Sequence, residues 1–340
     1  IRVGPHSAAS EPGPACYGRG GLEPTITDAN LLLGRLDADN FAGGALRLSR
    51  DNAANAMARE IGQPLGMQAD TAAFGVCEVV DENMANAGRV HAVESGKDIA
   101  DYTMITFGGG GPLHAARLCE KMGVARFIVP AGAGVGSAIG FLRAPFGYEA
   151  VRSAFVRLSE FEAAQVNGLI DEMKAESLGF LRQGMPQGEP EMDCTAFMRY
   201  VGQGWEIPVA LPFKAFSAAD TVEFKARFEE AYTRFFGRPI EGPDIEIVSW
   251  SVRASSPLPP VARIEEVGAA YRAHEVTRRQ VFDVADGGFV EAGIYPREEL
   301  QVGARVDGPA IIVERETSTF VTSNFTATVQ PDGCLLVVRR

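Results

Sequence analysis

The chain has 340 residues, of which 46% are hydrophobic and 22% are charged, and its formal net charge is -12. This length and composition are typical of a globular protein of two domains, and the acidic balance argues against a nucleic-acid partner, which requires clustered Lys and Arg. No apolar run reaches the roughly 18 residues of a membrane span and no signal peptide is recognisable, so we expect a cytoplasmic protein with no membrane partner.

The first 21 residues are rich in Gly and Pro and have neither a helical nor a strand period, which is typical of a loop inside a domain. Helical periodicity begins near Asp28 and again near Ser49. A longer helix with a broad apolar face is predicted from Thr71 to about Val93.

A strand, a glycine turn and a helix then follow one another twice. The first apolar strand, Asp101–Phe107, ends at a run of four glycines before a helix predicted from Pro112 to Lys121. The second strand, Ala125–Pro130, ends at the glycine turn Gly132–Gly136, and a short helix follows. This order predicts an α/β unit with adjacent parallel strands, in which ligands bind beyond the carboxyl ends of the strands.

The pattern changes near Glu149. The sequence predicts helices at 159–183 and 217–236 and strands at 195–200, 206–211 and 244–253. Ser255–Pro260 resembles a linker, and the residues after it have the short apolar runs of a β-rich module. We therefore expect a first domain at 1–148 and a second, β-rich domain at 149–340.

The histidines and cysteines give little indication of a metal site. The five cysteines form no CxxC pair and the four histidines form no HxH or HxxxH pair. We expect buried thiols, and no metal site that this chain builds alone.

The strongest local signal for a ligand is the glycine run of Gly108, Gly109, Gly110 and Gly111. Residues without side chains let a ligand approach the backbone closely, but the run serves equally well as a tight turn for strand–helix packing. His114 in the next helical turn either contacts the ligand or is a capping or surface residue. Asp28 either caps a helix or approaches a metal–phosphate complex.

Arg199 and Gln203 lie near a predicted strand end, where they either contact a polar ligand or belong to a domain interface. No GxSxG, HExxH or P-loop sequence is present, so catalytic residues stay unassigned.

Several long segments resemble the hydantoinase/oxoprolinase family, which includes N-methylhydantoinase, 5-oxoprolinase and subunits of acetone and acetophenone carboxylases. The longest is VGPHSAASEPGPACYGRGGLEPTITDANLLLGRL, and the others follow in family order: TFGGGGPLHA, VPAGAGVGSAIGFL, RYVGQGWEIPV and DGPAIIVERETST. Small departures, such as SAASEPGP where SAGADPGP is usual, remove no distinctive group and leave the substrate open.

The resemblance implies an actin-like ATPase fold of the sugar kinase and heat-shock ATPase class, with 1–148 as its C-terminal lobe and an α+β domain after it. It implies ATP and Mg²⁺ or another divalent metal as cofactors, with the four glycines, His114 and Asp28 on the nucleotide side. The phosphate loops of the family lie in an N-terminal half that precedes this sequence. We therefore expect the chain alone to be inactive and to need that half and a hydantoinase B-type subunit or domain.

The activity implied first is ATP-dependent hydrolysis of a cyclic amide, in which phosphorylation of a carbonyl oxygen favours ring opening of the small-molecule substrate. The alternative is the ATP-binding subunit of an acetone- or acetophenone-type carboxylase. A third possibility, of another class, is a non-catalytic scaffold subunit.

Overall fold

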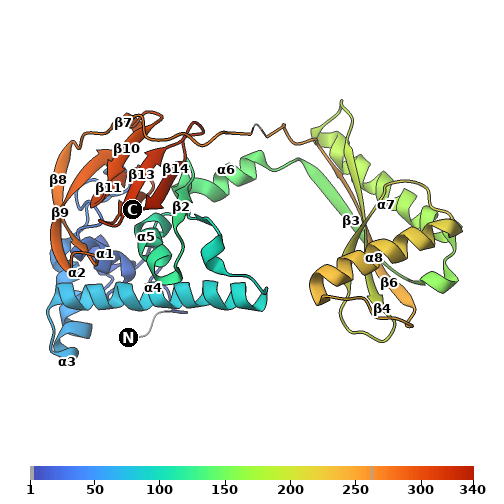
Figure 1. The fold of residues 1–340 in the computed structure, drawn as a ribbon, viewed down its shortest axis with the longest axis horizontal. Helices are drawn as coiled ribbons and strands as arrows, with labels where there is room; N and C mark the ends of the chain where they lie inside the picture. Colours follow the sequence, from blue (N-terminus) through green and yellow to red (C-terminus); the bar gives the residue numbers. More distant parts are fainter. Residues whose placement is uncertain (1–3, 262) are drawn as a thin grey trace. The chain divides into compact units, whose positions relative to one another are not determined.

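The computed structural model describes residues 4–261 and 263–340, which form two compact units. The first unit comprises Ile1–Leu142 together with Ala262–Arg340, and the second comprises Arg143–Val261. Figure 1 shows the elements of each unit.

Eight α-helices lie in the described residues: α1 (Ile26–Leu32), α2 (Arg50–Met57), α3 (Gln63–Leu65), α4 (Ala69–Glu94), α5 (Gly111–Met122), α6 (Gly136–Arg143), α7 (Ala163–Gly184) and α8 (Thr221–Phe236). The strands in the same residues are β1 (Met104–Ile105), β2 (Arg126–Val129), β3 (Gly147–Arg157), β4 (Glu191–Tyr200), β5 (Ile207–Leu211), β6 (Ile245–Ser255), β7 (Tyr271–Arg272), β8 (Thr277–Asp283), β9 (Gly288–Pro296), β10 (Ala304–Asp307), β11 (Ala310–Val313), β12 (Ser318–Val321), β13 (Phe325–Val329) and β14 (Leu335–Arg339).

The first unit contains two sheets, and both include strands from the end of the chain. The larger sheet has the order β1-β2-β14-β13-β10-β7, and the smaller one has the order β12-β11-β9-β8. In the larger sheet β1 and β2 are parallel, as the sequence predicts, and β14 is antiparallel to β2. Residues near the C-terminus therefore lie beside residues 126–129, as Figure 1 shows for β14 and β2.

Local sequence signals explain where the helices of the first unit begin. Thr25 caps α1 by accepting the backbone N–H of Asp28. Helix α5 begins directly after the glycine run, with Pro112 in its first turn, where a missing N–H costs no hydrogen bond. Leu113 of α5 packs against Val281, Ile311 and Phe320 of the smaller sheet, so the start of α5 is fixed to the C-terminal strands.

The second unit is a four-stranded antiparallel sheet, β3-β6-β4-β5, that packs against two helices. Trp250 of β6 is fully buried, in one cluster with Met173 of α7 and with Phe224 and Phe228 of α8. The alternation of buried and exposed residues along β4 and β5 matches a sheet with one buried face.

The two compact units are not continuous in the sequence, whereas the two domains predicted from the sequence are. The predicted boundary at 148/149 lies near the boundary between the compact units at Leu142/Arg143, and residues 149–340 are divided between the two units. The chain leaves the first unit, forms the second, and returns after Val261, beyond the linker-like segment Ser255–Pro260. The β-rich module is thus part of the first unit, because β2 pairs with β14, a pairing that no local pattern reveals.

The remaining structural expectations differ in detail only. Strand β1 has two residues where seven were predicted, and the first predicted residue, Asp101, belongs to the 3₁₀ turn Ile99–Asp101. Cys16, Cys77, Cys119 and Cys194 are buried, as expected, whereas Cys334 is partly exposed. No helix in the described part of the chain has the length and apolarity that a membrane span needs.

Candidate functional site

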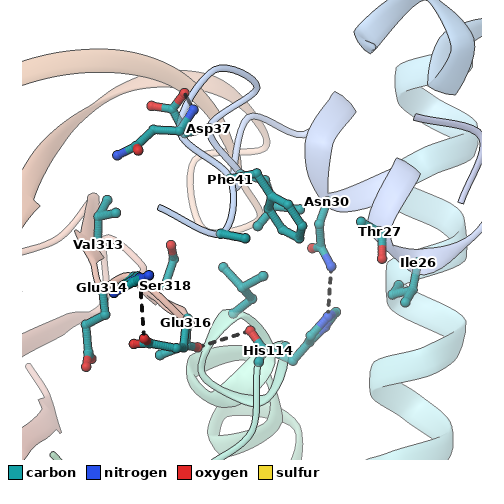
Figure 2. Close-up of a pocket in the computed structure, with 18 of the residues that line it drawn as sticks. Ile26, Thr27, Asn30, Asp37, Phe41, His114, Val313, Glu314, Glu316 and Ser318 are labelled. Atoms are coloured by element: carbon teal, nitrogen blue, oxygen red, sulfur yellow. Dashed lines mark hydrogen bonds and ion pairs between the residues drawn. The ribbon is translucent and has the colours of Figure 1, made fainter. Parts of the chain in front are cut away.

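A pocket of about 400 Å³ lies within the first unit, beside the start of α5 (Figure 2). Three segments distant in the sequence line it: the region from Tyr17 to Ala42, the glycine run with the first turn of α5, and the loop between β11 and β12. The lining residues are Tyr17, Ile26, Thr27, Asn30, Leu36, Asp37, Asn40, Phe41, Ala42, Gly109, Gly110, Leu113, His114, Val313, Glu314, Arg315, Glu316, Thr317 and Ser318. A concave site of this size, with apolar walls and a few polar groups, suits a small organic ligand.

The glycine run is held in place from two sides. The backbone N–H of Gly108 donates to the carbonyl of Ala133 at 2.7 Å. The hydroxyl oxygen of Thr317, which is nearly buried, lies 3.2 Å from the carbonyl oxygen of Gly108 and 3.1 Å from that of Gly109. Gly108 has a φ of +98°, which other residues rarely adopt. The turn is therefore a fixed part of the pocket wall.

The glycines differ in what a side chain would meet. A Cβ on Gly134 would lie 2.5 Å from the Cβ of Glu316, and one on Gly109 would lie 3.6 Å from the Glu316 carbonyl oxygen. Gly134 therefore allows the β11–β12 loop to approach closely, whereas a Cβ on Gly109 would make only an ordinary van der Waals contact. A Cβ on Gly110 would meet no atom within 4 Å. Packing therefore gives no reason for glycine at Gly110, which lines the pocket.

Carboxylates outnumber cations in the pocket lining. Asp37 forms an ion pair with Arg279, which leaves Glu314 and Glu316 beside Arg315. Burial raises the pKa of Glu314 above its usual value; the positive charge of Arg297 opposes the rise and the negative charge of Glu316 adds to it. A polyphosphate is poorly matched to such a wall, whereas carboxylates accept hydrogen bonds from hydroxyl groups well.

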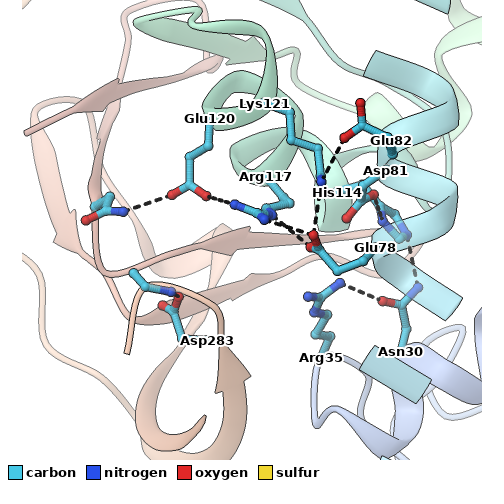
Figure 3. A network of polar contacts seen from close by, with 12 residues as sticks. Asn30, Arg35, Glu78, Asp81, Glu82, His114, Arg117, Glu120, Lys121 and Asp283 are labelled. Carbon is cyan, nitrogen blue, oxygen red and sulfur yellow. Dashed lines mark hydrogen bonds and ion pairs between the residues drawn. The ribbon is translucent and has the colours of Figure 1, made fainter. Parts of the chain in front are cut away.

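His114 is buried and does not extend into solvent. Its Nδ1 lies 2.7 Å from Oδ1 of Asp81 on α4, and its Nε2 lies 3.1 Å from Nδ2 of Asn30 on α1 (Figure 3). Its imidazole is only 7% exposed and Asp81 is fully buried. Neither a surface role nor a capping role describes this arrangement, because His114 connects α1, α4 and α5 at the pocket wall.

Asp28 lies outside the pocket lining. Its carboxylate, which is fully buried, accepts the backbone N–H groups of Ala15, Cys16 and Thr25 and the hydroxyl of Thr25, at 2.7–3.2 Å. Together with the Thr25 cap these bonds form a capping box. The capping alternative for Asp28 is therefore the one that the geometry describes, and we leave Asp28 out of the proposed site.

Replacing Asp28 with asparagine should lower the free energy of unfolding by about 1–3 kcal/mol, because an amide N–H would face backbone donors in a buried position. The affinity of the folded protein for its ligand should stay unchanged. Chemical denaturation and calorimetric titration of the same variant test both expectations. A loss of affinity at unchanged stability would show instead that Asp28 reaches the ligand.

Arg199 and Gln203 lie in the second unit and have partners there. Nε of Arg199 donates to Glu246 at 2.7 Å, and Nε2 of Gln203 donates to the hydroxyl of Tyr232 at 2.8 Å.

Within residues 4–261 and 263–340, no group of three or more His, Cys, Asp or Glu side chains is arranged to hold a metal ion.

Sequence reasoning missed most of the residues that complete the pocket. Thr317 and Glu316 lie in DGPAIIVERETST, and Asn30 lies in the TDAN part of the first family-like segment. The sequence thus indicates that these segments belong to the family, but it assigns no role to the three residues. Asn30 is only 3% exposed and still lines the pocket.

The sequence matches two family models along nearly its whole length. Residues 1–150 match the hydantoinase/oxoprolinase model, and residues 159–336 match the hydantoinase/oxoprolinase C-terminal domain model. The chain therefore belongs to the hydantoinase/oxoprolinase family.

Similar proteins include enzymes named for different reactions. The caprolactamase subunit alpha of Pseudomonas jessenii is 28% identical over 339 residues, which cover 98% of this chain and 49% of the relative. The caprolactamase crystal structure from the same organism has a TM-score of 0.75 at 27% identity, covering 99% of this chain and 50% of that one. A nucleotide-free acetone carboxylase, from work on ATP-dependent acetone carboxylation, has a TM-score of 0.82 at 26% identity and covers 100% of this chain and 50% of that one.

The chain spans about half the length of the relatives that it matches, 48% of an uncharacterized protein from Methanocaldococcus jannaschii and 49% of the caprolactamase subunit. The family is thus shown by the sequence and the fold, which is mixed α/β with several sheets.

Proposed function

We propose that this chain is the nucleoside-binding half of an ATP-dependent cyclic amidohydrolase of the hydantoinase/5-oxoprolinase type. The observation that carries the proposal is the pocket beside Gly110, where an open backbone position faces apolar walls. Tyr17, Leu36, Phe41 and Val313 provide surface for a base, and Glu314 and Glu316 provide acceptors for ribose hydroxyls.

The lining suits the nucleoside end of ATP better than its phosphates. The pocket has no excess of positive charge, and the chain contains no P-loop sequence. Residues outside this chain would bind the triphosphate, and this division fits a two-lobed, actin-like ATPase of which the first unit is part of the C-terminal lobe. The parallel strands β1 and β2 with α5 between them support this fold.

ATP would supply a phosphoryl group that makes a carbonyl or enolate oxygen a better leaving group. The residues of this chain would bind and orient the nucleoside. A divalent metal, for which the described residues offer no cluster, would be bound by the phosphates and the other half, and a hydantoinase B-type subunit would perform the later chemistry.

A carboxylase role is the second possibility, because the acetone carboxylase structure matches this chain with the higher TM-score of the two. Both roles would use the same nucleoside pocket.

The complete enzyme, with its partner subunit, should hydrolyse ATP faster when a cyclic amide is present. The test measures ATP turnover with hydantoin, 5-oxoproline, caprolactam, or a ketone plus bicarbonate. Stimulation by the ketone mixture alone would replace the amidohydrolase proposal with the carboxylase. Failure to bind any nucleotide would favour a scaffold subunit.

A further inference from the structure

Four buried polar side chains form a continuous chain, and two of them, Asn30 and His114, line the pocket (Figure 3). Arg35 donates from NH1 to Oδ1 of Asn30 at 3.2 Å. Nδ2 of Asn30 lies 3.1 Å from Nε2 of His114, and Nδ1 of His114 lies 2.7 Å from Oδ1 of Asp81. All four residues are at most 5% exposed.

The direction of these hydrogen bonds is fixed at both ends. A guanidinium group only donates and a carboxylate only accepts, so the protons point from Arg35 toward Asp81 along the whole chain. Asn30 must accept with its carbonyl oxygen and donate with its amide nitrogen. His114 must donate from Nδ1 to Asp81 and accept at Nε2. The two charges at the ends therefore hold one amide orientation and one imidazole tautomer.

Asn30 keeps hydrogen-bonding capacity after these contacts. Its amide nitrogen has a second N–H and its carbonyl oxygen a second lone pair. Cys77 lies 3.8 Å from the same oxygen, a long contact to a weak donor, and burial raises the pKa of its thiol to about 12, so the thiol stays neutral. Asn30 lines the pocket (Figure 2), and Arg35 and His114 hold its amide in one orientation there, with one N–H left over and only the weak Cys77 contact on the second lone pair.

We propose that Asn30 determines the specificity of the pocket for adenine, by donating to N7 and accepting from the 6-amino group of the base. This inference rests on the proposed function, since it names the part of the nucleotide that the pocket recognises. An asparagine amide pairs with N7 and N6 of adenine in this way, whereas guanine presents acceptors at both N7 and O6. The Asn30 oxygen would then face O6, and the amide cannot flip to relieve this because Arg35 and His114 hold it.

Arg35, His114 and Asp81 are positioning residues in this scheme. Arg35 is also packed, with its guanidinium 5.3 Å from the centre of the Phe320 ring, so the donor end of the chain is fixed on the smaller sheet. Oδ2 of Asp81 and Nε of Arg35 are buried without a hydrogen-bond partner among the described residues. Buried groups left this way are costly, so the chain depends on the bonds that it does make.

Altered nucleotides test the proposal without changing the protein. The complete enzyme should bind 7-deaza-ATP, which lacks the N7 acceptor, and purine riboside triphosphate, which lacks the 6-amino group, on the order of 10-fold more weakly than ATP. GTP should bind still more weakly. Calorimetric or fluorescence titration gives the four affinities. Equal affinities for ATP and 7-deaza-ATP would overturn the assignment of Asn30 while leaving nucleotide binding intact, and absence of all nucleotide binding would overturn the proposed function itself.

Protein variants show which residues cause the preference for ATP over its analogues and over GTP. In Asn30→Leu, ATP should bind on the order of 10-fold more weakly and the analogues should no longer differ from ATP. In Asp81→Asn, the ATP-to-GTP affinity ratio should fall, because the tautomer of His114 is no longer fixed. The amide of Asn324 binds Glu120 away from the pocket, so Asn324→Leu is the matched control. The ATP-to-GTP affinity ratio of this variant should match that of the wild type. If Asp81→Asn is folded, as judged by its thermal midpoint, and keeps the wild-type ATP-to-GTP affinity ratio, the positioning role of Asp81 is overturned.

Discussion

Replacing Gly110 with valine should weaken ATP binding by the complete enzyme on the order of 10- to 100-fold. A Cβ at this position would meet no protein atom within 4 Å, and the residue lines the pocket, so the added side chain would occupy ligand space. The factor corresponds to the roughly 1–3 kcal/mol that overpacking of a well-fitted site costs. Calorimetric titration of wild type and variant with ATP measures it.

Backbone strain does not contribute to this effect. Gly110 has a φ of -108°, which valine can adopt, and the left-handed member of the run is Gly108. Stability should fall by no more than about 1 kcal/mol, because Gly110 is the N-cap of α5 and valine is a poorer N-cap.

Gly75→Val is the matched control for this test. A Cβ on Gly75 of α4 also meets nothing within 4 Å, and Gly75 does not line the pocket. Its ATP affinity should stay near the wild-type value. If Gly110→Val instead lowered the unfolding midpoint and kept full affinity, the glycine run would be structural and the nucleoside site would lie elsewhere.

The sequence predicts those parts of the structure that depend on neighbouring residues. Helix α5 is found close to its predicted bounds because a glycine run with Pro112 precedes it and Gly123 ends it in a left-handed conformation. The parallel pairing of β1 and β2 follows from the order strand, glycine turn, helix, strand. The glycine run lies in this local pattern, and its members Gly109 and Gly110 line the pocket.

The contacts that complete the site depend on residues far apart in the sequence. Thr317 reaches the carbonyls of Gly108 and Gly109 across more than two hundred residues, and the packing of α5 against the smaller sheet brings these segments together. His114 obtains its role from Asn30 and Asp81, which lie on two other helices. Hydrophobic periodicity reports which face of a helix is buried, but it does not report which polar groups meet there.

The isolated 340-residue chain should hydrolyse no ATP. Its pocket combines Glu314 and Glu316 with a single Arg315, and two like charges 4 Å apart repel by about 1 kcal/mol in water and about 4 kcal/mol near a protein surface. The triphosphate therefore needs donors from elsewhere to be held and oriented, and without orientation phosphoryl transfer is not accelerated. A phosphate-release assay measures ATP hydrolysis by the isolated chain, and circular dichroism establishes that the chain is folded.

The second half of this experiment asks whether the missing donors lie in the preceding part of a longer polypeptide. Turnover should return when the isolated chain is joined to, or mixed with, the N-terminal half of the family protein and the hydantoinase B-type subunit. Adenosine, which lacks phosphates, should compete with ATP in the restored enzyme, because the pocket of this chain would bind the nucleoside alone. ATP hydrolysis by the folded chain without additions would contradict the division of the site between two lobes, since every group needed for phosphoryl transfer would then lie within these 340 residues.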